Sequence, residues 1–149
     1  MYTNLIGIKS KRVKNTVERG AVKKFAEAIG DNHPIFIDEQ FGSNSRFGRN
    51  IAPPTFPQVF DYGTIDGFTL TIEGLIHGEQ SYSYERPLFI GEEIFCYTKI
   101  IDYYEKTGSG GRLGFLLLAS NGEDEEENTI FTSKGLIIIT EEVRRMIEA

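Results

Sequence analysis

Two short stretches decide how this chain folds: Ala28-Ile29-Gly30-Asp31-Asn32-His33-Pro34-Ile35-Phe36-Ile37-Asp38 at residues 28–38, and Ile51-Ala52-Pro53-Pro54-Thr55-Phe56-Pro57 at residues 51–57. The first stretch ends a helix and places a carboxylate and an imidazole two residues apart. Proline follows the imidazole and pushes the residue before it toward extended geometry, so we expect a loop with a defined course. In the second stretch Thr55 can cap a helix and Pro57 suits its first turn. We expect the rest of the chain to be scaffold around these two turns.

Apolar residues at helical spacing precede the first turn and predict a helix there. Asn15 or Thr16 can cap this helix, Glu18 favours its N-terminal dipole, and Gly30 stops it. Residues 1–14 have no clear period and predict a leader with a short strand. The apolar positions of the predicted helix are Val17, Ala21, Val22, Phe25, Ala26 and Ile29.

Between the two turns and after them, the periodicity of the apolar residues is weaker. Residues 40–50 are rich in Gly, Ser, Asn and Arg and predict a surface loop or a short helix. A second helix should start near Pro57 and end by Gly63. Residues 64–76 are apolar without a dominant period, so we expect loop mixed with short helix.

From His77 onward the chain becomes β. Tyr82 and Tyr84 alternate with polar neighbours, and residues 93–104, 112–120 and 129–140 are rich in β-forming residues. A glycine-rich turn at 108–111 and an acidic loop at 121–128 separate these strands, and residues 141–148 predict a terminal helix. Helices followed by an antiparallel meander predict an α+β fold in which a curved sheet wraps one helix.

Composition limits the class of protein. The 149 residues, 40% of them hydrophobic, suit one domain spanning 1–149. The net charge of −6, concentrated at 123–127, argues against nucleic acid as a partner. The sequence has neither an 18-residue apolar run nor a signal-peptide layout, so we expect a cytoplasmic protein without membrane contact. The basic residues at 9–14 fit a solvated leader, or a contact with an acidic cofactor tail or carrier surface.

Cysteine and histidine counts restrict the chemistry further. Cys96 is the single cysteine, cannot form an internal disulfide, and should lie in the core of a strand. Two histidines without suitably spaced carboxylates predict no metal site. No phosphate loop, dinucleotide fingerprint or nucleophile elbow is present, and we expect no cofactor.

Four features could perform chemistry. Asp31 could act as a base or orient one, but aspartate in a turn also binds its own backbone, and composition alone favours that role. His33 could likewise take part in catalysis or only bond the backbone of its loop. His77, at the entry to a strand, could approach a ligand or bond a neighbouring loop. Backbone N–H groups at the 52–56 turn could hold a carbonyl oxygen, although helix starts are common.

Three ordered motifs resemble the N-terminal domain of MaoC-like dehydratases: residues 17–34, residues 52–57 and residues 76–92. They also resemble the substrate-binding type of subunit in bacterial (3R)-hydroxyacyl-carrier-protein dehydratases. The resemblance covers most of the chain. It implies a hot-dog fold, in which a long helix starting near Pro57 is wrapped by a curved antiparallel sheet. Two such units would pair around a tunnel for an acyl thioester.

In catalytic members of this family, an Asp and a His in a D-x4-H arrangement add or remove water at the 2,3 position of the thioester. Backbone N–H groups at the helix start hold the thioester carbonyl. Asp31 matches the Asp, but Phe36 stands where the His is expected, and His33 takes the position usually held by Asn. The resemblance thus implies Asp31 and His33 as candidate catalytic residues. The candidate substrate-binding residues are Phe36, Pro54, Thr55, Phe56 and His77.

Phe36 leaves several functional hypotheses. The preferred one is a binding subunit in a heterodimer whose partner supplies the D-x4-H pair, acting on acyl-CoA or acyl-carrier-protein thioesters. A homo-oligomer, such as a homodimer, using His33 is a second, and a non-enzymatic acyl-binding or interaction module is a third. Thioesterase activity ranks last, because nothing places Asp31 at the carbonyl.

Overall fold

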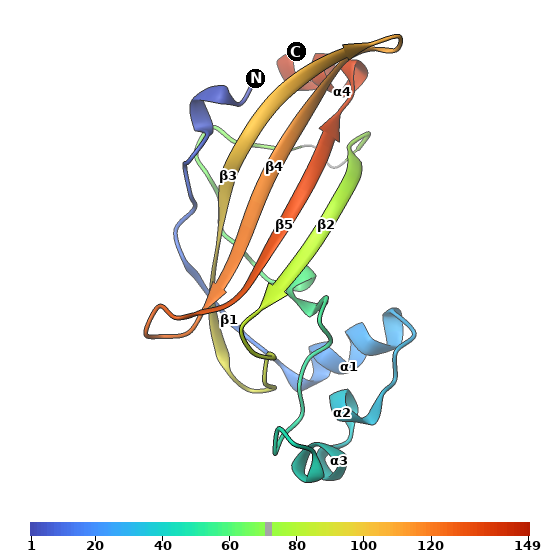
Figure 1. The fold of residues 1–149 in the computed structure, drawn as a ribbon, viewed down its shortest axis with the longest axis vertical. Helices are drawn as coiled ribbons and strands as arrows, with labels where there is room; N and C mark the ends of the chain where they lie inside the picture. The colour runs from blue at the N-terminus through green and yellow to red at the C-terminus, as the bar shows by residue number, and fades with distance from the viewer. Residues whose placement is uncertain (71–72) are drawn as a thin grey trace.

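The computed structural model describes residues 1–70 and 73–149 (Figure 1). Helices α1–α3 lie below a tall sheet, and both chain ends lie near its top. The elements in chain order are η1 (Thr3–Leu5), β1 (Val13–Thr16), α1 (Arg19–Ala28), α2 (Pro34–Ile37), α3 (Glu39–Asn44), η2 (Phe56–Val59), β2 (Ile76–Tyr84), β3 (Glu93–Gly108), β4 (Gly111–Glu123), β5 (Thr129–Ile139) and α4 (Glu141–Glu148).

The sheet is antiparallel, with the strand order β1-β3-β4-β5-β2. Strands β3, β4 and β5 form the predicted meander, and β2 joins it by pairing with β5 (Figure 1). The strands predicted from the β-rich runs are confirmed, and β3 and β4 extend beyond the runs to meet at the Gly108–Gly111 turn. The prediction of an α+β fold with a curved antiparallel sheet is therefore correct.

Helices α1 and α4 form where the sequence predicts them. Gly30, with φ +71°, ends α1, because its N–H bonds the Glu27 carbonyl and the Asp31 N–H bonds the Ala26 carbonyl. The caps predicted for this helix were wrong. Asn15 and Thr16 pair with β3 as part of β1, and α1 begins only after Glu18.

The first turn holds more helix than expected. Instead of a loop, residues 34–37 form α2, because Pro34 supplies helical φ at its first position while His33 stays extended. In the following segment, the short-helix alternative is confirmed by α3.

The long helix expected from Pro57 does not form. Helix η2 is one 3₁₀ turn, and the described residues 60–70 and 73–75 contain neither helix nor strand. Gly63 and Gly67 have φ values of +74° and +77°, which a right-handed helix excludes. The short helix expected within 64–76 is likewise absent from the described residues, while Thr71 and Ile72 lie outside them. The described part of this connection therefore crosses the sheet as a loop.

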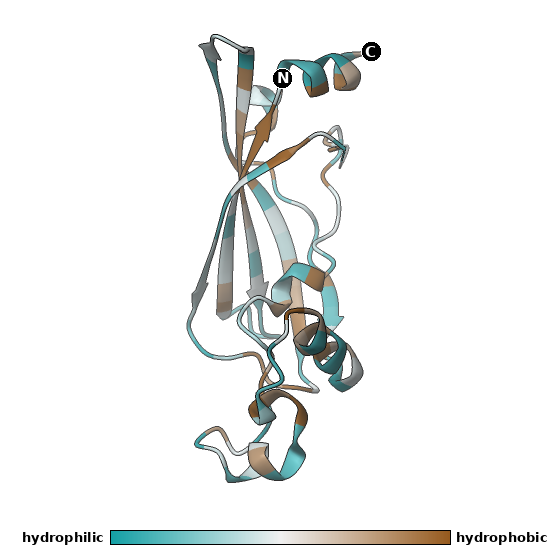
Figure 2. Cartoon of the chain, turned by 90° about the vertical axis from the view of Figure 1, so that its right-hand side faces the viewer, coloured by the Kyte–Doolittle hydropathy of each residue, from teal (hydrophilic) through white to brown (hydrophobic). Residues whose placement is uncertain are grey.

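One face of the sheet, here called the inner face, carries the apolar core in two separate clusters. Figure 2 shows η2, α1 and the connecting segment on this side of the sheet. The lower cluster joins the helices to the sheet through Val22, Phe36, Phe56, Cys96 and Phe131. The upper cluster comprises Tyr2, Leu5, Ile65, Ile100, Tyr103, Leu116, Ile139 and Val143.

Polar side chains cross the inner face between the two clusters. Thr98, Ser120, Ser133 and Tyr82 are direct cross-strand partners on β3, β4, β5 and β2. They share a face because alternate residues of a strand point to the same side. We call these four residues the hydroxyl row. The inner face is thus apolar at both ends and polar in the middle.

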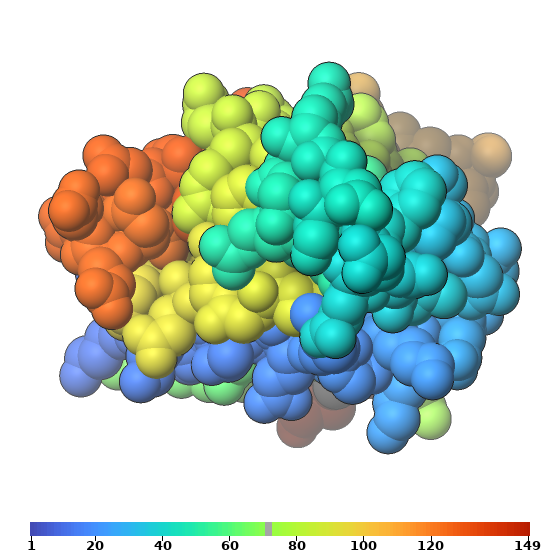
Figure 3. All heavy atoms as spheres, turned by 90° about the horizontal axis from the view of Figure 1, so that it is seen from below, coloured from blue at the N-terminus to red at the C-terminus, as the bar shows by residue number. Residues whose placement is uncertain are grey.

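The lower end of the molecule has two projections. Viewed from below, α2, α3 and the segment after them form one, and the acidic loop forms the other (Figure 3). Asp124 organises the acidic loop by accepting hydrogen bonds from the N–H groups of Glu126 and Asn128. The Asn128 side chain also donates to Asp124 and contributes most to lowering the pKa of this exposed carboxyl, followed by the backbone bonds. Within the described residues, no helix is long and apolar enough to cross a membrane.

Replacing Gly122 by alanine should destabilise the lower cluster. A Cβ there would lie 2.7 Å from the Phe131 Cδ1 and Cζ atoms, inside a packed core. Overpacking of this kind costs about 1–3 kcal/mol of unfolding free energy, measurable by urea denaturation. Gly20→Ala in α1 is the matched control, because a Cβ there meets nothing within 4 Å and should stabilise the helix by about 0.5 kcal/mol. Equal effects of the two changes would contradict this packing.

Candidate functional site

The Asp31 and His33 side chains both bind the backbone of their own loop. Asp31 Oδ1 accepts a hydrogen bond from the His33 N–H at 3.3 Å, and His33 Nδ1 accepts one from the Ile35 N–H at 3.1 Å. His33 is thus the N-cap of α2. Both residues are exposed, and the His33 ring packs edge-on against Phe41 at 5.5 Å between centroids. Their nearness in sequence therefore serves the local turn.

Phe36 points into the lower cluster instead of the loop. Its side chain is 7% exposed and belongs to the same cluster as Phe56. Phe36 thus occupies core volume at the position where the D-x4-H pattern expects an imidazole. The ring that replaces the expected His is part of the scaffold.

The proline-rich turn divides its residues between core and surface. Phe56 is buried, whereas Pro54 and Thr55 are exposed. The side-chain cap expected from Thr55 is absent, but Pro57 does lie in the first turn of η2. The N–H groups of Phe56 and Gln58 bond the carbonyls of Pro53 and Thr55, and Pro57 has no N–H. The amides of Phe56 and Gln58 are therefore already used within this single turn.

A cavity of about 380 Å³ lies beside the proline-rich turn. Tyr84 on β2 anchors its wall by donating a hydrogen bond to the Pro54 carbonyl at 2.6 Å. Burial raises the pKa of the Tyr84 hydroxyl, so this group stays a donor at neutral pH. The lining residues are Ile51, Ala52, Pro54, Tyr84, Glu85, Arg86, Pro87 and Leu88.

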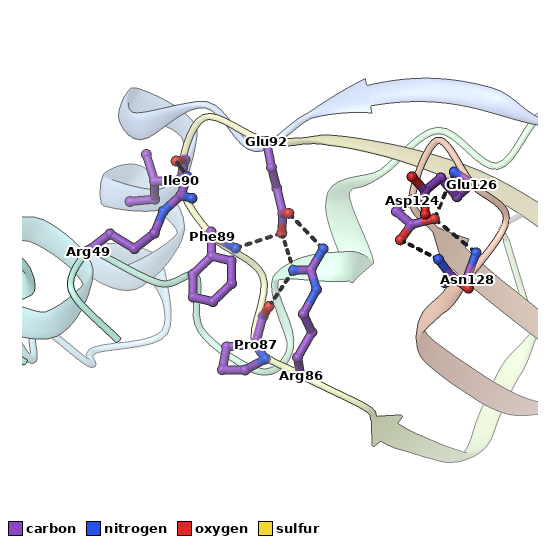
Figure 4. A network of polar contacts seen from close by, with 9 residues as sticks. All are labelled: Arg49, Arg86, Pro87, Phe89, Ile90, Glu92, Asp124, Glu126 and Asn128. Atoms are coloured by element: carbon purple, nitrogen blue, oxygen red, sulfur yellow. Dashed lines mark hydrogen bonds and ion pairs between the residues drawn. The ribbon is translucent and has the colours of Figure 1, made fainter. Parts of the chain in front are cut away.

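The turn after β2, which contributes to the wall of this cavity, is closed by a bidentate ion pair (Figure 4). Arg86 donates from both terminal nitrogens to the two Glu92 carboxylate oxygens, each at 2.9 Å. Glu92 also accepts the Phe89 N–H at 2.7 Å, and Arg49 donates to the Ile90 carbonyl. Because a bidentate pair of this kind is geometrically fixed, Arg86 holds the cavity wall and its charge is already matched.

His77 reaches the inner face because β2 contains a bulge. The register shifts between His77 and Glu79, so that His77 pairs with Ile137 and Gln80 pairs with Gly135. Both side chains then lie on the same face, although three positions separate them. His77 Nε2 lies 2.9 Å from Gln80 Oε1. The bulge therefore re-aims His77 toward the groove described next.

A groove runs along the inner face where the long helix was expected. Two cavities, of 370 and 200 Å³, share Gln58, Gln80 and Ser120 in their walls. The first cavity is otherwise lined by Leu70, Leu75, His77, Leu118, Gly135 and Ile137. The second is otherwise lined by Pro57, Tyr62, Tyr82 and Ser133. We call the two cavities together the inner groove.

Sequence reasoning missed most of the inner groove. Among the residues that line the groove, the sequence pattern indicated only His77 as a site residue. It gave the other polar residues of the groove only ordinary strand or helix positions: Gln58, Gln80, Ser120 and Ser133. One available signal was a polar residue at an inward position of each apolar strand. The alignment of these residues depends on the strand register, which the sequence pattern alone does not supply.

Of the predicted site residues, the structure brings Phe36 and Phe56 together, keeps Asp31 and His33 in their own loop, and leaves His77 apart. Phe36 and Phe56 share the lower cluster, and Pro54 lines the cavity beside the turn. His77 lies in the inner groove instead. Among residues 1–70 and 73–149, no group of three or more His, Cys, Asp or Glu side chains is arranged to hold a metal ion.

The comparisons with known proteins identify the family. A profile described as "FAS1-like, dehydratase domain region" matches residues 4–133. The chain belongs to this family. A UPF0336 protein from Thermobifida fusca is 30% identical over 102 residues, which cover 62% of this chain and 65% of that protein. A UPF0336 protein from Saccharopolyspora erythraea is 24% identical over 128 residues, which cover 82% of this chain and 80% of that protein. The first of these alignments thus spans slightly less than two thirds of the relative.

Solved structures share the hot-dog fold with this member of the FAS1-like dehydratase region family. A chain of the C-terminally truncated HadBC (3R-hydroxyacyl-ACP dehydratase) complex from Mycobacterium tuberculosis superposes with a TM-score of 0.74 and 16% identity, covering 93% of this chain and 99% of that one. The MaoC-like dehydratase from Rhodospirillum rubrum superposes with a TM-score of 0.68 and 18% identity, covering 91% of this chain and 92% of that one. A chain of the ChsH1-ChsH2 complex from Mycobacterium tuberculosis superposes with a TM-score of 0.71 and 19% identity, covering 87% of each chain. The resemblance to MaoC-like hot-dog domains is therefore confirmed.

Replacing His33 should separate its capping role from any catalytic role. His33→Ala removes the acceptor for the Ile35 N–H and should lower the unfolding free energy by about 1 kcal/mol. His33→Asn keeps a capping acceptor and should retain most of this stability, although an amide cannot transfer a proton. Urea denaturation of both variants measures the difference. Equal losses in the two variants would argue against the capping role.

The Cys96 thiol should be inert in the folded chain. It is fully buried in β3, as predicted from the sequence, and this burial raises its pKa to about 12. Because the thiolate is the reactive form, only about one thiol in ten thousand would be ionised at about pH 8. A colorimetric thiol reagent should therefore react only after unfolding in urea. Stoichiometric reaction with the native chain would contradict this burial.

Proposed function

We propose that this chain is the acyl-binding subunit of an acyl-thioester dehydratase or hydratase whose partner subunit supplies the catalytic Asp/His pair. The substrate would be an acyl-CoA or acyl-carrier-protein thioester in the cytoplasm, and the reaction would need no cofactor. The observation that supports this proposal most is the place of Phe36, which lies in the lower cluster at the position of the expected His. Membership of a dehydratase family supplies the reaction class.

Water addition across a 2-enoyl thioester needs one group to accept a proton and another to donate one. Phenylalanine can do neither, and losing one half of an acid–base pair costs about 10²–10⁴ in rate. His33 is the nearest imidazole in sequence, but its Nδ1 accepts the Ile35 N–H. Asp31 likewise accepts a bond from its own loop. These contacts favour a partner-supplied pair over catalysis by Asp31 and His33 alone.

The edge of β2 is a surface on which such a partner could pair. In the described sheet β2 hydrogen-bonds β5 on one side only. The backbone groups on its other side can pair with a strand of a second subunit. Two similar structures are, by their titles, the HadBC and ChsH1-ChsH2 complexes, each named for two components. A heterodimer with a D-x4-H-bearing hot-dog subunit is the assembly that we propose, with a homodimer as the alternative.

A binding module without catalysis is the second candidate function. The inner groove and the cavity beside the proline-rich turn would suit an acyl ligand even if no partner supplied a base. The same exposed, backbone-bound Asp31 and His33 that disfavour catalysis by this chain are compatible with this candidate. Thioesterase activity has no comparable support, because no contact among the described residues places Asp31 beside a carbonyl site.

An assay of 2-enoyl-CoA hydration tests the proposal. The isolated chain should hydrate crotonyl-CoA slowly, and activity should rise at least about 100-fold when a subunit carrying an intact D-x4-H motif is added. The activity of the mixture should survive His33→Asn in this chain. The loss of enoyl-thioester absorbance on hydration measures the rate, and sedimentation measures the complex.

Fast hydration by the isolated chain, abolished by Asp31→Asn and by His33→Asn, would instead support the homo-oligomeric enzyme. Binding without activity in any mixture would support the binding module. If acyl-CoA failed to stabilise the chain against heat, acyl binding itself would be contradicted. A ligand at about 100 times its dissociation constant should add about 2.7 kcal/mol to the unfolding free energy.

A further inference from the structure

The inner groove has a polar middle that an unsubstituted hydrocarbon chain would not fit well. Three members of the hydroxyl row, Tyr82, Ser133 and Ser120, line it from three adjacent strands, and Gln58 and Gln80 line both of its cavities. Ser133 is only 4% exposed, yet it is a polar residue in the core. Covering such groups with an apolar ligand would cost about 1–3 kcal/mol for each group left without a partner. The groove therefore favours an occupant with its own hydrogen-bonding group.

The polar side chains of the groove are held in place by one another. Gln80 Nε2 donates to Ser133 Oγ, and Gln80 Oε1 faces His77 Nε2 at 2.9 Å. Tyr82 donates to Gln58 Oε1 at 2.6 Å. The Ser133 hydroxyl accepts from Gln80 and bonds the Tyr82 oxygen, whereas among the described residues the Gln58 amide nitrogen donates to no partner. The network is thus ordered and retains donors for a ligand.

The apolar part of the groove lies beyond this polar band. Leu70, Leu75, Leu118 and Ile137 line the larger cavity on the side of the upper cluster. On the other side, Tyr84 contacts the proline-rich turn through Pro54. Gln80 is four residues from Tyr84 along β2, which is about 13 Å at the usual rise of a strand. Along the inner face from Tyr84 upward, the polar residues therefore come first and the apolar end of the groove comes afterwards.

We propose that the inner groove binds an acyl chain that bears an oxygen substituent, a hydroxyl or keto group, part-way along its length and beyond the 2,3 position at which the dehydratase reaction acts. Tyr82, Ser120 and Ser133 together with Gln58 and Gln80 recognise this oxygen, and the remainder of the chain lies among the leucines and Ile137. This inference rests on the proposed function, because it specifies the substrate class of the acyl-binding subunit. The amides of a pantetheine arm have similar hydrogen-bonding chemistry, and the experiment separates the two sources.

Calorimetric titration of the full chain with a matched series of ligands tests this inference. The series consists of dodecanoate, its positional monohydroxy isomers, and the CoA thioesters of all of them. One set of hydroxyl positions beyond carbon 3 should bind about threefold to tenfold more tightly than the unsubstituted chain, which is the value of one or two net hydrogen bonds, whereas a preference for the 3-hydroxy isomer alone would overturn the inference. The same preference should appear in the free acids and in the thioesters.

Two variants identify the residues responsible. Gln80→Met removes the amide while keeping a similar length, and it should abolish the preference for the hydroxylated chain without weakening the binding of dodecanoate. Gln40→Met is the matched control, because Gln40 is an exposed glutamine on α3. It should leave both affinities unchanged. Urea denaturation of Gln80→Met checks that the sheet remains folded.

The outcomes distinguish this inference from the proposed function. Equal affinities for plain and hydroxylated chains would overturn the oxygen preference and leave the acyl-binding subunit standing. A gain in affinity that appears in every thioester but in no free acid would show that the polar side chains of the groove bind pantetheine amides. This result would also overturn the oxygen preference. Failure of every ligand to bind would overturn both proposals.

Discussion

The inner face of the sheet has to be covered, and this constraint governs the rest of the structure. Strands β2 to β5 present this face, but the described part of the connection from η2 to β2 supplies no long helix to pack against it. The chain instead covers the two ends separately, with α1, α2 and η2 below and with η1, Ile65 and α4 above. Burial at both ends leaves the middle of the face open as the inner groove. A split core and a groove therefore have the same cause.

Each end of the inner face is closed by a different kind of contact. The lower end is aromatic, with Phe56 packed edge-on against Phe25 and Phe60 at 5.5 and 5.4 Å between centroids. The upper end includes Arg144, which is 2% exposed and bonds Glu105 at 2.6 Å and the Tyr103 hydroxyl at 3.2 Å. Such a pair has a desolvation cost that offsets much of its attraction, so it fixes the position of α4 more than it adds stability.

Patterns that depend on neighbouring residues were predicted well from the sequence. Alternation identified the strands, and periodicity with Gly30 identified α1, because each signal is local. The helix predicted from Pro57 to Gly63 was wrong in length because Phe60 already adopts extended geometry, with ψ 152°, and the left-handed Gly63 and Gly67 exclude the longer helix that the resemblance implies. Asp31 binds its own loop, as composition alone favoured, whereas the bond that His33 accepts from the Ile35 N–H depends on α2, which was not predicted. The hydroxyl row depends on register across four strands, which no single stretch encodes.

The place of Phe36 explains why catalysis would be difficult to restore in this chain by one substitution. An imidazole at position 36 would replace a ring that packs in the lower cluster, where a polar group needs a buried partner. It would also lie in the core, away from the solvent in which the Asp31 side chain is exposed. The chain has thus committed this position to packing, and the hot-dog fold tolerates the change because the sheet and its clusters do not depend on the catalytic pair. In the assembly that we propose, a partner that keeps the pair would act on a ligand that this chain helps to hold, and a binding role and a catalytic role would be divided between two copies of one fold.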